Sequence, residues 1–427
     1  SNIGGYRWGA SMSRMPTGLG LGYRQSNIAN LGVKWETQEQ VNVGIDLGFF
    51  HERVNLIVDW YKKVSKDMLL SLQLPSYMGT SGNASSALAA PMGNYGDIEN
   101  KGWEISLNTH PLIGAFEWDS DFQISFNRNK LRALDGTANA QIVGYGQWSD
   151  VVSVTNVGES LYNFYGYVCD GVYEDLEDLQ TSAKPAKYPA DGVFNRTNTV
   201  WVGDIKYKDL NGDGVIDEND RTNIGSPLPK FTFGWTNTFR YKNFDLSLFI
   251  NGSYGNKVFN YLGMKLTHMN SPWSNQLNTV LDRAQIVPID PNKDYSAGVV
   301  VNTDTIYNWY DDITNVRVAN AGATIPRASI QDPNDNDRIS DRYIEDGSYI
   351  RLKNITLGYT FPGKIIKKWG LDNLRVYANI QNLLTITGYS GYDPEIGAST
   401  ASANVYGLDN GRYPSPTVYS FGLNVSF

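Results

Sequence analysis

Apolar and polar side chains alternate along many short segments of this chain. Between positions 41 and 49, one parity is wholly apolar: Val41, Val43, Ile45, Leu47 and Phe49. Alternation with period two places such residues on one face of a β-strand, whereas a helix would spread them around its circumference. The pattern recurs at 54–60, 103–107, 122–126, 231–241, 244–250, 355–361, 374–380 and 419–427. The sequence therefore predicts an all-β fold with about nine antiparallel strands.

The connectors between these predicted strands alternate in length. Short ones follow Phe49, Leu107, Tyr241 and Phe361, and Lys242-Asn243 suits a two-residue hairpin turn. Long ones lie at about 65–97, 128–230, 255–345 and 385–415. Outer-membrane β-barrels have short turns at one end and long loops at the other. With nine strands, the C-terminus lies on the short-turn side, which is periplasmic in such a barrel, and the long loops are extracellular.

Composition fits a membrane barrel. The chain has 27 Tyr, 16 Phe, 11 Trp and 42 Gly, and it contains no run of eighteen apolar residues that would make a transmembrane helix. A transmembrane strand needs only about 9–11 residues, of which alternate ones face lipid. Aromatic residues at strand ends fit interface girdles, and the polar faces fit a hydrated lumen. A secreted β-sandwich or propeller, which also alternates, is the competing interpretation.

The net charge and the reactive residue types of the chain argue against several classes of function. The 44 acidic and 36 basic residues give a net charge of −8, which argues against a nucleic-acid partner. One cysteine, Cys169, excludes an intramolecular disulfide and is expected to be a small buried residue. Glu104, Glu117, Asp119 and Asp121 could suggest glycoside hydrolysis, but lumen-facing acids explain them without chemistry. We expect no enzymatic activity.

One loop has the spacing of a calcium site. Oxygen-bearing side chains occupy positions 1, 3, 5, 9 and 12 of a calcium-loop pattern, and Gly214 occupies position 6, where the turn is sharp. The predicted ligands are Asp209, Asn211, Asp213, the backbone carbonyl of Val215, Asp217 and Asp220. We expect a structural Ca²⁺ within the extracellular connector 128–230. The alternative is a solvated acidic loop.

Short motifs along nearly the whole chain resemble the SusC-like (SusC/RagA) family of TonB-dependent outer-membrane transporters. They are Val33–Thr37, Asn42–Asp46, Tyr61–Lys63, Lys66–Leu69, Gly96–Gly102, Gly203–Asp209, Gly252–Asn256, Arg351–Asn354, Gln381–Leu384 and Gly391–Glu395. The resemblance implies the C-terminal part of a plugged barrel of about twenty-two strands. It implies import of an oligosaccharide or oligopeptide, with energy from the TonB complex and a SusD-like surface lipoprotein as lid.

The resemblance also implies that other segments complete the protein. The plug and the earlier strands are not among residues 1–427, so we expect truncation or a second chain, because nine strands cannot close such a barrel. Ser1–Gly5 is not a signal peptide. Lipid and lipopolysaccharide would surround a multi-pass barrel in the bacterial outer membrane. The alternative function is a secreted, calcium-stabilised β-rich adhesin or glycan-binding protein.

The sequence also suggests roles for individual residues in the loops and in the last strand. Aromatic loop residues are candidates for contact with cargo: Trp201, Trp273, Trp309, Tyr310 and Tyr392. For any one of them, packing within a loop is the simpler interpretation. The last strand, with Tyr419, Phe421 and Phe427, is similar to the signal that the barrel-assembly machinery reads. A further strand at Phe164–Tyr167 would break the parity of the barrel, so we expect these residues in an extracellular loop.

Overall fold

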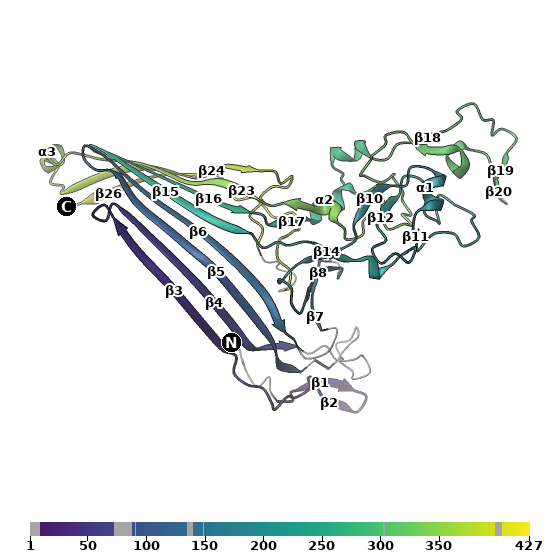
Figure 1. The fold of residues 1–427 in the computed structure, drawn as a ribbon, viewed down its shortest axis with the longest axis horizontal. Helices are drawn as coiled ribbons and strands as arrows, with labels where there is room; N and C mark the ends of the chain where they lie inside the picture. Colours follow the sequence, from purple (N-terminus) through teal and green to yellow (C-terminus); the bar gives the residue numbers. More distant parts are fainter. Residues whose placement is uncertain are drawn as a thin grey trace.

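The computed structural model describes residues 9–71, 88–89, 91–134, 140–147, 149–301, 304–397 and 404–427. Its largest element is a nine-stranded antiparallel sheet, which occupies the left part of Figure 1. The strands are β3 (Thr37–Phe49), β4 (Val54–Ser71), β5 (Met92–Leu112), β6 (Phe116–Ala133), β15 (Phe231–Tyr241), β16 (Phe244–Tyr254), β23 (Tyr349–Thr360), β24 (Asn373–Thr387) and β26 (Val418–Ser426). Each pairs with the next in chain order, so all nine predicted strands and their antiparallel arrangement are confirmed.

Several strands are longer than a bilayer requires. β4 has 18 residues and β5 has 21, whereas about 9–11 residues span the hydrocarbon layer. At about 3.3 Å per residue, β5 extends to roughly 70 Å. Compared with the predicted segments 54–60 and 103–107, most of the excess lies toward the long-connector end. At that end, β16 and β23 lead into a second part of the molecule (Figure 1).

The register joins the apolar positions of neighbouring strands into one continuous face. Trp60 lies opposite Trp103, and Trp103 lies opposite Phe126. The row continues to Phe231 and Tyr254, whose ring centroids are 5.1 Å apart. Because the side-chain period is two, one residue of slip would move a whole strand's apolar set to the other face.

Two polar residues on the apolar face receive hydrogen bonds from tryptophans of a neighbouring strand. Asn237 of β15 is buried, and its Oδ1 accepts a hydrogen bond from Trp118 Nε1 at 3.0 Å. Trp235 Nε1 likewise donates to Ser120 Oγ at 2.9 Å. Indole donors thus satisfy oxygens that would otherwise face hydrocarbon, where an unpaired polar group costs several kcal/mol.

The opposite face carries ion pairs that cross strands. Arg375 of β24 reaches over β23 to Asp245 of β16, with Nε 3.0 Å from Oδ1. Gly358 lies beneath this pair, and a Cβ built there would come within 2.4 Å of both Arg375 Nη2 and Asp245 Oδ1. The glycine therefore leaves the space through which the two charges meet.

Three of the connectors at the short-turn end are tight, as predicted. Phe50, His51 and Glu52 all have positive φ between β3 and β4, and Lys242 has φ 53° in the two-residue turn between β15 and β16. The connector after Phe361 is longer than expected, because it contains α3 (Gly363–Ile366) and η7 (Lys367–Trp369) before β24. The C-terminus lies at this same end (Figure 1).

The long connectors fold together into a compact unit, which we call the loop body and define as the described residues within 140–230, 255–348 and 388–417. Its strands are β7 (Gln141–Tyr145), β8 (Val151–Asn156), β9 (Phe164–Gly166), β10 (Cys169–Val172), β11 (Lys184–Pro185), β12 (Ile205–Tyr207), β13 (Val215–Ile216), β14 (Thr222–Gly225), β17 (Lys257–Asn260), β18 (Ile286–Pro288), β19 (Val299–Val301), β20 (Asp304–Ile306), β21 (Val316–Val318), β22 (Ile344–Asp346) and β25 (Leu408–Asp409). Its helices are α1 (Leu176–Thr181), α2 (Tyr261–Thr267), η2 (Glu218–Asp220), η3 (Asn278–Asp282), η4 (Trp309–Asp311), η5 (Ile313–Asn315) and η6 (Asp341–Tyr343).

The conventional hydrophobic core lies in the loop body. One cluster surrounds Trp201, Tyr173 and Leu179, and a second surrounds Phe164 and Phe259. Phe164 starts β9, which belongs to a separate four-stranded sheet, β14-β9-β8-β7. Phe164–Tyr167 thus adds no strand to the large sheet, as predicted, although Phe164–Gly166 forms a short strand of its own, and the extracellular position of these residues stays a prediction.

Two further features complete the description. A hairpin of β1 (Met12–Thr17) and β2 (Gly20–Gln25) lies below the ends of β4 and β5 in Figure 1. No helix among the described residues is long and apolar enough to cross a membrane.

Gly358→Ala should destabilise the sheet by up to about 1 kcal/mol, the contribution of a partly exposed ion pair, because its Cβ forces the charged ends of Arg375 and Asp245 apart. Heat-induced unfolding of the purified full-length protein, followed by gel mobility, measures the effect. Gly363→Ala is the matched control, since no atom lies within 4 Å of its added Cβ. Equal unfolding temperatures for the two variants would contradict the packing argument.

Candidate functional site

The loop body is built around a buried ion pair between segments far apart in sequence. Arg327 Nε lies 2.7 Å from Asp204 Oδ1, and Nη2 lies 3.2 Å from Oδ2. Asp204 also accepts hydrogen bonds from the backbone N–H of Trp201 and from Asn336 Nδ2. Gly203 has φ 86°, and a Cβ there would collide with Ile286 and crowd Arg327. The Gly203-Asp204 pair therefore needs glycine both for its backbone and for its close packing.

Asn336 extends this pair into a network. Its side-chain oxygen accepts a hydrogen bond from Ile205 N at 2.7 Å, and Asn334 Nδ2 donates to Ile205 O at 2.9 Å. Asp332 accepts hydrogen bonds from both the backbone and the side-chain nitrogen of Asn336. The segment 332–336 thus lies inside the loop body. Its buried side chains of Asn334 and Asn336 are hydrogen-bonded to Ile205 of β12.

His268 completes the network by pairing with two carboxylates, those of Asp332 and Asp337, and we call these three residues the ion triad. Its Nε2 lies 2.8 Å from Asp332 Oδ2, and its Nδ1 lies 3.0 Å from Asp337 Oδ2. Burial alone lowers the pKa of His268, but the hydrogen bonds to Asp332 and Asp337 outweigh it and raise the pKa to about 9. His268 is therefore an imidazolium at neutral pH, with a carboxylate on each nitrogen.

The same triad is the one group of three potential metal ligands that the described residues bring within 4.8 Å. A metal would require a neutral imidazole with a free nitrogen. Here both nitrogens have carboxylate partners, so charge pairing accounts for the cluster without an ion.

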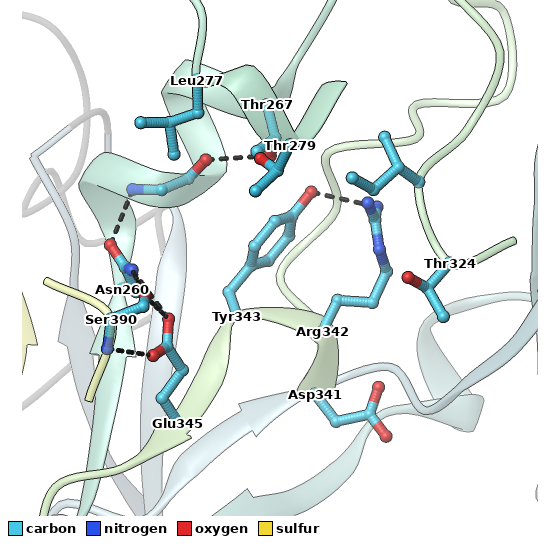
Figure 2. A pocket seen from close by; sticks show the side chains of 12 residues that line it. Asn260, Thr267, Leu277, Thr279, Thr324, Asp341, Arg342, Tyr343, Glu345 and Ser390 are labelled. Atoms are coloured by element: carbon cyan, nitrogen blue, oxygen red, sulfur yellow. Dashed lines mark hydrogen bonds between the residues drawn. The ribbon is translucent and has the colours of Figure 1, made fainter. Parts of the chain in front are cut away.

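A pocket of about 490 Å³ opens beside this network (Figure 2). Five segments supply its walls: α2 with Asn260, residues 277–279, residues 324–325, residues 341–345, and Ser390. Figure 2 shows Arg342 next to Tyr343, whose Oη accepts a hydrogen bond from Arg342 Nη1 at 3.1 Å. Nη1 also donates to Asn336 O at 2.9 Å, so the pocket is anchored to the buried network.

The pocket has a mixed apolar and polar lining, and hydrogen-bond partners hold both of its acidic side chains in place. Glu345 accepts hydrogen bonds from Asn260 Nδ2 and from the backbone and hydroxyl of Ser390. Asp341 accepts one from Cys169 N at 2.9 Å. With the guanidinium of Arg342 and the hydroxyls of Thr279 and Thr324, the lining offers donors and acceptors for a polar, uncharged or zwitterionic ligand.

Cys169 is partly buried near this pocket and packs against the Trp201 cluster. Burial raises the pKa of its thiol to about 12, so it stays protonated and unreactive. This agrees with its expected role as a small packing residue.

The predicted aromatic contacts do not gather at one place. Trp201 is 1% exposed within the hydrophobic cluster, so its ring offers no face to cargo, and the prediction for Trp201 is wrong. Trp309 packs against the same cluster, and the guanidinium of Arg196 lies over the ring of Tyr310 at 5.1 Å. Trp273 and Tyr392 are 93% and 70% exposed, and they keep free ring faces.

Tyr392 stands on a loop that is tied firmly to the sheet. Arg351 of β23 is buried and binds Asp393 at 2.5 Å and Glu395 at 2.8 Å, and its Nε donates to Thr385 Oγ1. Lys353 adds a second contact to Glu395 at 3.1 Å. The motifs Arg351–Asn354 and Gly391–Glu395 are therefore held together by ion pairs.

The loop 209–220 is closed by its own hydrogen bonds. Asp209 accepts bonds from Gly212 N and Gly214 N, and Asp213 accepts one from Val215 N. Asp220 is buried, and its two oxygens accept from Leu210 N and Asp217 N. The side chains of Asn211 and Asp213 are exposed, and the carboxylates of this loop do not form a group of three within 4.8 Å. The donor set, which contains only oxygen, fits calcium chemically.

Sequence reasoning missed the polar network. Arg327, His268 and Asn336 lie in three places along the chain, and neither spacing nor periodicity connects them. The run Asp332-Pro333-Asn334-Asp335-Asn336-Asp337 was the available signal, since six turn-forming or acidic residues in succession are unusual outside a loop with a specific role.

Comparison with known proteins adds an independent result. The family model described as "TonB dependent receptor-like, beta-barrel" matches residues 5–251. TonB-dependent receptor P3 of Formosa agariphila is 32% identical over 411 residues, covering 94% of this chain and 35% of that protein. TonB-dependent receptor SusC of Bacteroides thetaiotaomicron is 27% identical over 402 residues, covering 93% and 32%. The chain thus spans about a third of the length of these curated relatives.

A solved structure supports the fold. The structure titled "Structure of the RagAB peptide transporter" covers the whole of this chain with a TM-score of 0.69, at 20% identity and over 39% of its own chain. The curated relatives are named as receptors, so the prediction that this chain is not an enzyme is confirmed.

The loop body should lose stability as the pH rises above neutrality. The pKa of His268 is raised on folding from 6.5 to about 9, so its contribution is complete below pH 6.5 and is lost as the pH rises through about 9. His268→Gln should lower hydrogen-exchange protection of residues 332–337 at pH 6.5, by a few kcal/mol at most, and flatten its pH dependence. His51→Gln, in the exposed turn after β3, is the control. Protection that is independent of pH in the unaltered protein would refute the triad's role.

Proposed function

Because the chain belongs to the TonB-dependent receptor β-barrel family, we propose that it forms the C-terminal part of an outer-membrane transporter for an oligomeric nutrient. The observation that carries this proposal is the nine-stranded meander, with one continuous apolar face, a polar face with ion pairs, and all long connectors at one end. A secreted adhesin would bury its apolar face, whereas Val43, Ile45 and Trp103 are exposed.

Further strands complete the barrel in this proposal. Among the described residues, β3 and β26 each pair on one side only within the large sheet. An open edge in lipid leaves a row of backbone groups without partners, so both edges must be covered. The relatives' greater length leaves room for these strands and for a plug. We place residues 1–427 in the barrel's C-terminal portion, with the short turns and the C-terminus periplasmic and 128–230 extracellular.

The loop body is the proposed meeting place of cargo and partner. It stands at the end where the proposed extracellular lid, a SusD-like lipoprotein, would dock, and TonB would supply energy from the periplasmic side. Trp273 and Tyr392 are the exposed aromatic candidates for cargo, and the pocket around Arg342 offers hydrogen-bonding groups within a partly apolar lining. Both an oligosaccharide and an oligopeptide fit such groups. The role of Tyr419, Phe421 and Phe427 as an assembly signal stays a prediction.

Loss of the full-length protein should remove growth on one class of oligomer. A deletion strain is compared with its parent on a panel of oligosaccharides and oligopeptides supplied at limiting concentration. Growth should fail on one class, return with the unaltered gene, and fail on the same class in a strain without TonB. Normal growth of the deletion strain on the entire panel, or recovery of the protein in a detergent-free soluble fraction, would refute the transporter.

We also propose that the loop 209–220 binds a structural Ca²⁺. Asp209, Asn211, Asp213 and Asp217 would give side-chain oxygens, Val215 its carbonyl, and Asp220 would close the shell. Three features support this: a donor set of oxygens only, a turn at Gly214 with φ 82°, and a high density of carboxylates. Bound calcium would neutralise their mutual repulsion and hold the connector rigid beside the lid.

Asp213→Ala should abolish calcium-dependent ordering of this loop while the barrel stays inserted. Hydrogen exchange of residues 209–220 is measured with calcium and with chelator. Asp191→Ala is a matched control, because Asp191 is exposed and, like Asp213, accepts a hydrogen bond from the backbone N–H two residues later. If calcium leaves exchange in the unaltered protein unchanged, the site does not exist.

A further inference from the structure

The connector between β23 and β24 differs from the other connectors at the short-turn end. It runs from Phe361 to Asp372 and folds as α3 and η7, ended by Gly370 in the left-handed conformation. Backbone hydrogen bonds fasten it at both ends, from Phe361 N to Leu374 O and from Asp372 N to Ser426 O. It is therefore a fixed element rather than a loose loop.

This element packs against the end of the sheet. Ile366 is buried, and α3 contacts β24. Leu374 is buried although Val376 and Leu423, which share its face, are exposed. The covering of Leu374 indicates that the connector folds over the end of the face that is directed to lipid.

The outward surface of the connector combines apolar and basic side chains. Ile365 of α3 and Trp369 of η7 are both exposed. Lys364, Lys367 and Lys368 are exposed as well. None of these lysines is ion-paired within the part of the chain that the structure describes, and the connector's one acidic residue is Asp372.

The position of this surface matches the boundary of a bilayer. The neighbouring strand ends carry an aromatic cluster, in which Phe244 and Tyr359 have ring centroids 4.7 Å apart and Tyr359 and Phe361 5.1 Å apart. Such rings mark the membrane interface of a barrel. Figure 1 shows α3 at the very end of the sheet, and along the chain it follows directly after Tyr359 and Phe361. The lysines thus lie at the level of lipid headgroups.

We propose that Lys364, Lys367 and Lys368 form a binding site for the headgroup of an anionic phospholipid, with Ile365 and Trp369 inserted among its acyl chains. Three cations without protein partners, beside an apolar pair, are complementary to a phosphate that carries hydrocarbon. With the proposed orientation, the lipid belongs to the periplasmic leaflet. A basic surface of this kind could also dock an acidic protein, but the exposed Trp369 and Ile365 favour lipid. This inference rests on the proposed membrane barrel.

The test uses Trp369 as a reporter. The full-length protein is reconstituted in phosphatidylethanolamine bilayers that contain brominated phosphatidylglycerol or brominated phosphatidylcholine. The quenching lost in Trp369→Phe gives the contact of Trp369 with each lipid. Phosphatidylglycerol should be preferred severalfold, with a loss of roughly fivefold at most for each lysine removed. The triple variant Lys364→Gln, Lys367→Gln, Lys368→Gln should bring the two lipids to equal quenching.

Two controls make the outcome decisive. Lys187→Gln, Lys208→Gln and Lys230→Gln together remove the same charge from exposed positions outside the connector and should leave the preference intact. Equal quenching of Trp369 by both lipids in the unaltered protein, or a preference that survives the triple variant, would overturn the site. Loss of lipid quenching from Trp60, Trp103 and Trp235 as well would overturn the barrel itself, so the two failures are distinguishable.

Discussion

Backbone pairing inside the bilayer is the constraint on which this molecule depends. In hydrocarbon no water satisfies an amide, so each strand must give its N–H and C=O groups to two neighbours. The meander meets this demand with the simplest connectivity, because each strand pairs with the one before and the one after it. The same demand explains why Asn237 and Ser120, polar residues on the apolar face, each accept an indole hydrogen bond. It also fixes the register, which aligns the aromatic rows from strand to strand.

The sheet could be predicted from sequence because its signal is local and repeated. In β3, five apolar residues of one parity define the apolar face of the strand, and the partner strand follows after a short turn. The loop body has no such period. Trp201 looked like a surface aromatic in a long loop, but it is the centre of a hydrophobic cluster that segments more than a hundred residues apart build together. Contacts between residues so far apart cannot be recognised from the spacing of residues along the sequence. For the same reason, the ion-pair partners of Arg327 and His268 could not be predicted.

The short motifs that carried the family resemblance have physical reasons in this structure. Gly203 and Asp204 form a backbone turn that receives Arg327, and Arg351 receives the acidic pair Asp393 and Glu395. Both are places where the loop body is tied to itself or to the sheet. A buried ion pair contributes little net stability compared with apolar packing, but losing one partner leaves an unpaired charge in the interior. These residues therefore specify one arrangement of long segments that could otherwise pack in several ways.

The wide sequence separation of the Asp204–Arg327 pair has a consequence for the order of folding. The two residues are 123 positions apart, and the segment between them contains the hairpin of β15 and β16, whose strands are joined by a two-residue turn. Closing a loop of that length is slow compared with forming the hairpin, because long-range contacts pay chain entropy before they return any binding. The sheet can therefore form hairpin by hairpin. The loop body can fold only later, because it needs the connector before β15 and the connector after β16. In a barrel that is inserted from the periplasm, these connectors would cross to the far side as unfolded chain and condense only after arrival.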